Sequence, residues 1–110
     1  MADFNKDFDN YKLYYNSHHP NQLEAVIHCF KGHVYVGNIV FYDDGGAIPA
    51  NNIQVNNVPV TATVNYALSR FADVMNILRY EKPVHLFVSE SVLNGWVATG
   101  TGELVGEQET

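Results

Sequence analysis

Two arginines and one tryptophan are the side chains of this chain with the clearest capacity to hold a ligand. Ser69 stands before a segment with helical spacing, so we expect it to be the helix N-cap, and Arg70 follows it directly. A helix N-terminus presents free N–H groups to an anion, and an arginine beside it can bind phosphate or carboxylate through two hydrogen bonds. Arg79 falls on the helix stripe that should be buried, where it needs water, a carboxylate or a ligand.

Trp96 belongs to a short predicted strand and would offer a flat stacking face if it is partly exposed. The predicted ligand-binding residues are therefore Ser69, Arg70, Arg79 and Trp96, a set that suits a small nucleotide. Ordinary structural roles are the alternative: a solvated Arg70, an Arg79 that extends past the sheet to an acidic side chain, and a Trp96 in the core.

The histidines and the single cysteine give little sign of metal or nucleophilic chemistry. His28 and His33 are expected on one sheet face within reach of each other, but a stable zinc or copper site needs more ligands than two. Cys29 is expected on an inward face, where burial raises the thiol pKa and leaves it unreactive. We therefore predict no catalytic residue, no bound metal and no cofactor.

Charge and composition narrow the classes of partner. The net charge of −6 at pH 7 argues against long nucleic acids and anionic membrane surfaces, which require a positive patch. No apolar run approaches the ~18 residues of a membrane span, and the first residues do not form a signal peptide. One cysteine cannot form an internal disulfide, so we expect a cytoplasmic protein.

The pattern of apolar residues predicts an α+β fold. Short strands are expected over residues 11–15, 23–30, 33–42, 52–55, 58–64, 84–89 and 95–99. Helical spacing predicts one amphipathic helix after Leu68, which Pro83 ends. Because the connections are short and rich in turn residues, we expect about six to seven strands in one antiparallel sheet packed against that helix, in the order strands, helix, two strands.

The ends of the chain differ from its middle in composition. Residues 1–10 are polar and acidic with isolated Phe4 and Phe8, and residues 100–110 contain three glycines and three glutamates. We therefore predict a flexible N-terminal arm, a single domain over residues 11–99 and a flexible C-terminal tail.

A turn at Lys31-Gly32 would set the register of the two longest strands. One face then carries a conventional core set: Leu23, Ile27, Cys29, Val34, Val36 and Val40. The other face carries Glu24, Val26, His28, Phe30, His33, Tyr35, Ile39 and Phe41. The outer face of a monomer should be polar, so this aromatic face needs a cover, which is either the strand over 11–15 or a second subunit. The predicted subunit interface consists of His28, Phe30, His33, Tyr35, Ile39 and Phe41.

Three functions are compatible with these features. The first is a small non-enzymatic, self-associating protein that binds or sequesters a protein partner or a small anionic ligand, as inhibitors and phage proteins that block host defence often do. The second is a sponge or sensor for a signalling nucleotide that uses Arg70, Arg79 and Trp96. The third is a small metal enzyme based on His28 and His33.

Overall fold

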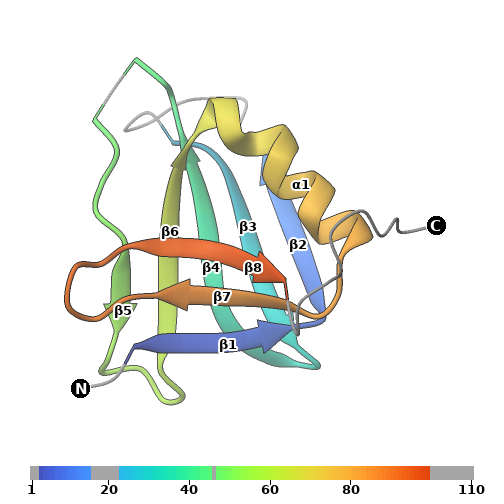
Figure 1. Ribbon diagram of the computed structural model, residues 1–110, viewed down its shortest axis with the longest axis vertical. Helices are drawn as coiled ribbons and strands as arrows, with labels where there is room; N and C mark the ends of the chain where they lie inside the picture. Colours follow the sequence, from blue (N-terminus) through green and yellow to red (C-terminus); the bar gives the residue numbers. More distant parts are fainter. Residues whose placement is uncertain (1–2, 16–22, 46, 100–110) are drawn as a thin grey trace.

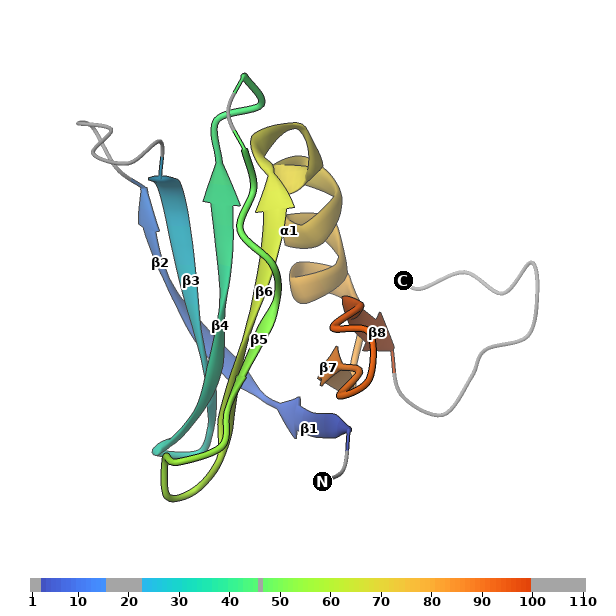
Figure 2. The same cartoon turned by 90° about the vertical axis from the view of Figure 1, so that its left-hand side faces the viewer.

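The computed structural model describes residues 3–15, 23–45 and 47–99. Its elements are β1 (Phe4–Phe8), β2 (Asn10–Tyr15), β3 (Leu23–Lys31), β4 (Val34–Tyr42), β5 (Asn52–Gln54), β6 (Thr61–Ala67), a 3₁₀ turn (Leu68–Arg70), α1 (Phe71–Tyr80), β7 (Val84–Val88) and β8 (Gly95–Thr99). A five-stranded sheet has the order β2-β3-β4-β6-β5, and a three-stranded sheet has the order β1-β7-β8. The strands of the two sheets cross (Figure 1), and the small sheet lies with α1 on one side of the large sheet (Figure 2).

The predicted α+β class is confirmed, but the single antiparallel sheet is wrong. The strands form two sheets, and β4 pairs with β6 in parallel. The chain does turn at Asp44-Gly45, but it then runs through 47–51 to the edge of the sheet and forms β5 there. β6 folds back between β4 and β5, so it runs antiparallel to β5 and parallel to β4.

The predicted N-terminal arm over residues 1–10 is wrong for the part that the structure describes. Phe4–Phe8 forms β1 and pairs with β7, and both phenylalanine side chains are buried. Residues four apart in a strand point to the same face, so the two rings anchor β1 together. The predicted tail at 100–110 lies outside the described residues.

The hairpin of β3 and β4 turns one residue later than predicted. Lys31 pairs with Val34, and Gly32 and His33 form the turn. Gly32 has φ 61°, a left-handed conformation that favours glycine. His33 therefore lies in the exposed turn and not on the sheet face where it was predicted.

A β-bulge then changes which residues of β4 face the core. Cys29 pairs with Gly37 and Phe30 pairs with Tyr35, so Val36 has no partner on β3 and is the extra residue of the bulge. One added residue reverses the alternation beyond it, because successive strand residues point to opposite faces. Ile39 and Phe41, predicted at a subunit interface, are consequently fully buried in the core.

The helix begins later than predicted. Ser69 lies inside the 3₁₀ turn, and the N-cap residue of α1 is Arg70, which makes no side-chain capping hydrogen bond. The helix stripe also differs from the expected one, because Val74 and Met75 are its buried residues and Arg79 is exposed. Arg79 therefore does not interrupt the packing face of the helix.

The core lies between the large sheet and the layer formed by α1 and the small sheet. Its fully buried side chains include Ile27, Ile39, Phe41, Val64, Leu86 and Val88. Cys29 is buried as predicted, and burial raises its pKa to about 12, so the thiol stays protonated at neutral pH.

Gly37 allows β4 to approach both β6 and β7 closely. A Cβ at this position would overlap the carbonyl oxygen of Ala62 and would lie 2.8 Å from Leu86 Cδ2. The backbone of β6 would have to move to make room, which is costly in a packed interior.

We expect Gly37→Ala to lower the free energy of unfolding by about 1–3 kcal/mol or more, because the added methyl group overpacks the contact between β4 and β6. Urea denaturation measures this change. Gly45→Ala is the matched control, since a Cβ there would meet only Asp43 Oδ1 at 3.8 Å. Equal stability of the two variants would contradict the close approach.

A cluster of charges ties the corner between β1 and β2 to the β3–β4 turn. Lys31 Nζ lies 2.8 Å from Asp7 Oδ2 and 4.0 Å from Asp9 Oδ2, and the N–H of Gly32 donates to Asp9 Oδ1 at 3.0 Å. The hydrogen bond from Lys31 holds the pKa of Asp7 below its usual value, and the Gly32 N–H does the same for the pKa of Asp9.

Because both carboxyl pKa values are lowered by folding, these contacts stabilise the fold fully above about pH 4 and are lost as the pH falls through the lowered values. An NMR titration of the carboxyl carbons measures both groups. We expect Lys31→Met to return the pKa of Asp7 toward its usual value and to leave that of Asp9 lowered, since the main cause at Asp9 is a backbone N–H. Equal shifts at both carboxyls would show that the assignment of causes is wrong.

Candidate functional site

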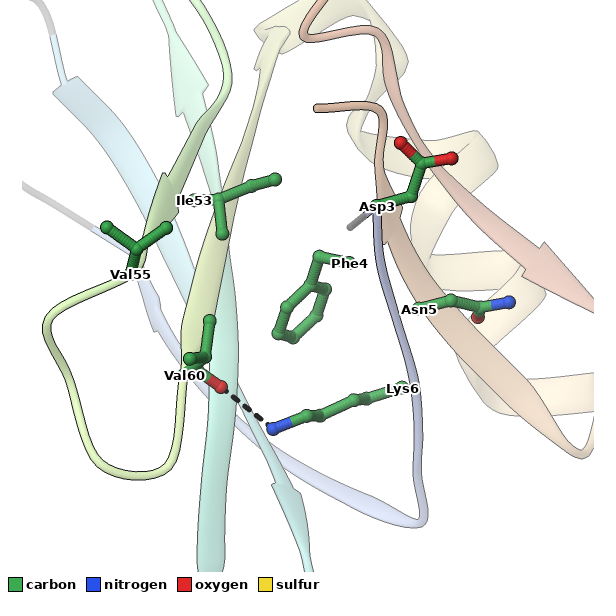
Figure 3. Close-up of a pocket in the computed structure, with 7 residues that line it drawn as sticks. All are labelled: Asp3, Phe4, Asn5, Lys6, Ile53, Val55 and Val60. Atoms are coloured by element: carbon green, nitrogen blue, oxygen red, sulfur yellow. Dashed lines mark hydrogen bonds between the residues drawn. The ribbon is translucent and has the colours of Figure 1, made fainter. Parts of the chain in front are cut away.

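A cavity of about 430 Å³ lies between β1 and the hairpin formed by β5, β6 and their connection (Figure 3). Its volume falls within the ~300–1,000 Å³ typical of small-molecule sites, towards the lower end. The lining residues are Asp3, Phe4, Asn5, Lys6, Ile53, Val55 and Val60. Four of these seven side chains are apolar, and they form the body of the cavity.

The alternation of β1 places a cation in this cavity. Phe4, Lys6 and Phe8 share one face of the strand, so the Lys6 side chain points toward the large sheet as the two anchoring rings do. Figure 3 shows Phe4 and Lys6 pointing from β1 toward Ile53 and Val60, while Asn5 points away. The lysine is half-buried, and its ammonium group reaches the start of β6.

The Lys6 ammonium group has few partners. Its Nζ donates to the carbonyl oxygen of Val60 at 2.9 Å and lies 5.4 Å from the centre of the Phe4 ring. Among the described residues it has no carboxylate partner. An ammonium group carries three N–H donors, so donors remain for a ligand.

Asp3 adds a second polar group at the rim of the cavity. Its Oδ1 accepts the backbone N–H of Glu90 at 2.8 Å, which ties the start of β1 to the β7–β8 connection. Asp3 is thereby occupied in a structural contact, and Lys6 is the cation that a ligand in the cavity would meet. This arrangement can hold an apolar body and one anionic end.

This site was not predicted from the sequence, because Lys6 belongs to a segment that was expected to be a flexible arm. A signal was present in the spacing of Phe4 and Phe8, which suits a strand with one apolar face. Lys6 stands between them on that same face.

The predicted anion site at Ser69 and Arg70 is exposed at the 3₁₀ turn. The backbone N–H of Ser69 donates to Asp44 Oδ1 at 3.1 Å, so a carboxylate of the chain itself already occupies this donor. Fewer free N–H donors are therefore left for an external anion at this site than the sequence suggested.

The other predicted ligand residues are dispersed. Arg70 is the N-cap of α1 and Arg79 lies in its last turn, about 14 Å away along the helix axis. Trp96 is half-exposed on β8 and stacks on Phe87, with ring centres 4.5 Å apart and planes inclined by 12°. No hydrogen bond or ring contact joins Trp96 to either arginine within the described residues.

Three of the six predicted interface residues do share the outer face of the large sheet. His28 lies 5.7 Å from Tyr35, Phe30 lies 5.7 Å from Tyr35, and Tyr14 of β2 lies 5.3 Å from His28, all between ring centres. β2 extends the sheet as its edge strand instead of folding over this face, so the first of the two alternatives, a cover by the strand over 11–15, is wrong. Figure 2 shows no described element on that side.

The histidines do not form a metal site in the described part of the chain. His28 packs against two tyrosine rings, and His33 lies in the turn beyond the pair of Phe30 and Tyr35. No group of three His, Cys, Asp or Glu side chains among the described residues is arranged to hold a metal ion. No described helix is long and apolar enough to cross a membrane.

Comparisons with models of protein families, with curated proteins and with solved structures gave no match to this chain.

Proposed function

We propose that this protein is a non-enzymatic binding protein whose ligand is a small, mainly apolar anion held in the cavity between β1, β5 and β6. The supporting observation is the Lys6 ammonium group at the wall of an otherwise apolar cavity, without a carboxylate partner among the described residues. A half-buried cation in such a position favours an anionic group brought by a ligand.

The apolar lining determines the rest of the ligand. Phe4, Ile53, Val55 and Val60 can bury an aliphatic chain or one ring system, with about 25 cal/mol gained for each Å² of apolar surface removed from water. The net charge of −6 repels anions at long range, so affinity must come from these local contacts. A short-chain or aromatic carboxylate fits both requirements.

The lining also favours binding over catalysis. The seven side chains include no hydroxyl, thiol or imidazole group, and the two ionisable ones, Asp3 and Lys6, are each held by a hydrogen bond to the backbone. The nucleotide alternative has less support, because Arg70 and Arg79 lie at opposite ends of α1.

We expect wild-type protein to bind octanoate more tightly than octanol, measured by displacement of the fluorescent anion anilinonaphthalene sulfonate. Lys6→Met removes the charge and keeps a similar side-chain volume, so this preference should disappear. A charge-assisted hydrogen bond contributes about 1.5–3 kcal/mol, which corresponds to a loss of about 10- to 100-fold in octanoate affinity.

Lys12→Met is the matched control for this experiment. Lys12 also lies over an aromatic ring, 5.9 Å from the centre of Phe30, but it is exposed on β2, away from the cavity. Octanoate binding that is unchanged in Lys6→Met, or equally weakened in both lysine variants, would disprove the proposal.

A second variant tests the cavity without removing the charge. Val55 lines the cavity and is half-exposed, so Val55→Trp should fill the space and weaken octanoate binding at least tenfold with little change in thermal stability. Val58→Trp is the control, because Val58 is 98% exposed in the neighbouring loop. Full octanoate binding by Val55→Trp would place the ligand elsewhere.

A further inference from the structure

β2 is an edge strand whose outer side is open within the described residues. It pairs with β3 on one side and is the terminal strand of the large sheet on the other. Its side chains are unusually apolar for an exposed edge, with Leu13 39%, Tyr14 56% and Tyr15 59% exposed. A row of unpaired N–H and C=O groups beside apolar side chains is a template for pairing with another strand.

The opposite edge of the large sheet has the features that prevent such pairing. β5 has three residues, of which Asn52 and Gln54 are polar, and both its ends run directly into loops. Short polar edges are a common protection against association. β2 has six residues, no proline and a single charge at Lys12, so only one edge of this sheet is suited to a partner strand.

We propose that β2 pairs antiparallel with β2 of a second copy of this chain and forms a two-fold symmetric dimer with a continuous ten-stranded sheet. The interface is separate from the Lys6 cavity and does not depend on the proposed ligand. A two-fold axis beside β2 pairs the open β2 edges of the two copies with each other, so the assembly closes at two subunits. The ten-stranded sheet then ends in β5 on both sides.

Symmetry and charge restrict the register, and the length of β2 favours an axis through Leu13. Residues that face each other across an antiparallel pair must point to the same side of the sheet, so the axis passes through a residue and pairs it with itself. An axis through Lys12 would place two ammonium groups face to face. An axis through Leu13 pairs the two leucines and places Lys12 beside the second copy's Tyr14, where cation–π contact is favourable.

The same register also pairs the remaining aromatic residues. Tyr11 of each copy faces the second copy's Tyr15 on the side of the sheet that carries α1, where Tyr15 already contacts Phe71. All five residues from Tyr11 to Tyr15 thus gain a cross-strand partner. Charge favours this edge as well, because β2 contains none of the twelve acidic residues of a chain with net charge −6.

The oligomeric state is the first test. Sedimentation equilibrium of the full chain at micromolar concentration should give twice the 12.3 kDa of one chain. Leu13→Lys places two like charges on the axis and should give a monomer with an unchanged circular dichroism spectrum. Val34→Lys, at an exposed position of β4, should remain dimeric. A wild-type monomer, or a Leu13→Lys dimer, would overturn the proposal.

Cysteine cross-linking tests the register itself. Only the residue on a two-fold axis faces its own copy, at the Cα separation of about 4.5–5.5 Å that a disulfide accepts. Leu13→Cys should therefore form a covalent dimer under mild oxidation, and Tyr14→Cys should do so at least tenfold more slowly. The native Cys29 is buried and protonated, so it gives little background. Equal rates at the two positions would exclude this register.

Discussion

The inner face of the five-stranded sheet must be covered, and α1 is too short to cover it alone. β3 and β4 have nine residues each and are about 30 Å long, whereas the ten residues of α1 span about 15 Å. The three-stranded sheet covers the remaining half, and it packs closely because Gly37 has no side chain. β1, anchored by Phe4 and Phe8, completes this cover, and the cavity lies where β1 faces β5 and β6.

The elements that could be predicted from the sequence are those that depend on neighbouring residues. The helix, the β7–β8 pair and the β5–β6 hairpin depend on local spacing and turns, and all three are present. The bulge at Val36 leaves no local signal, yet it reverses the side of the sheet on which Ile39 and Phe41 lie. The parallel pairing of β4 with β6 has no short sequence motif either, because it arises when β6 inserts between β4 and β5.

The candidate site was beyond local inference for the same reason. Lys6 and its acceptor Val60 are 54 positions apart, and β1 finds its partner in β7 near the far end of the described chain. Arg70 and Arg79 were predicted to bind an anion because their residue type suits one, but the length of α1 separates them. Residue types indicate which chemistry is possible, whereas the long-range pairing of strands determines which side chains line a cavity.

The pairing of β1 with β7 also determines the order in which the chain can fold as it is synthesised. Strands β2 to β6 have all their partners within residues 10–67, so the large sheet can form while the later segments are still being made. β1 is synthesised before these strands but has no strand to pair with until Val84–Val88 follows. Closing so long a loop is slow compared with forming local hairpins. The Lys6 cavity is therefore completed after the large sheet, because β1, which precedes that sheet in the chain, must wait for β7.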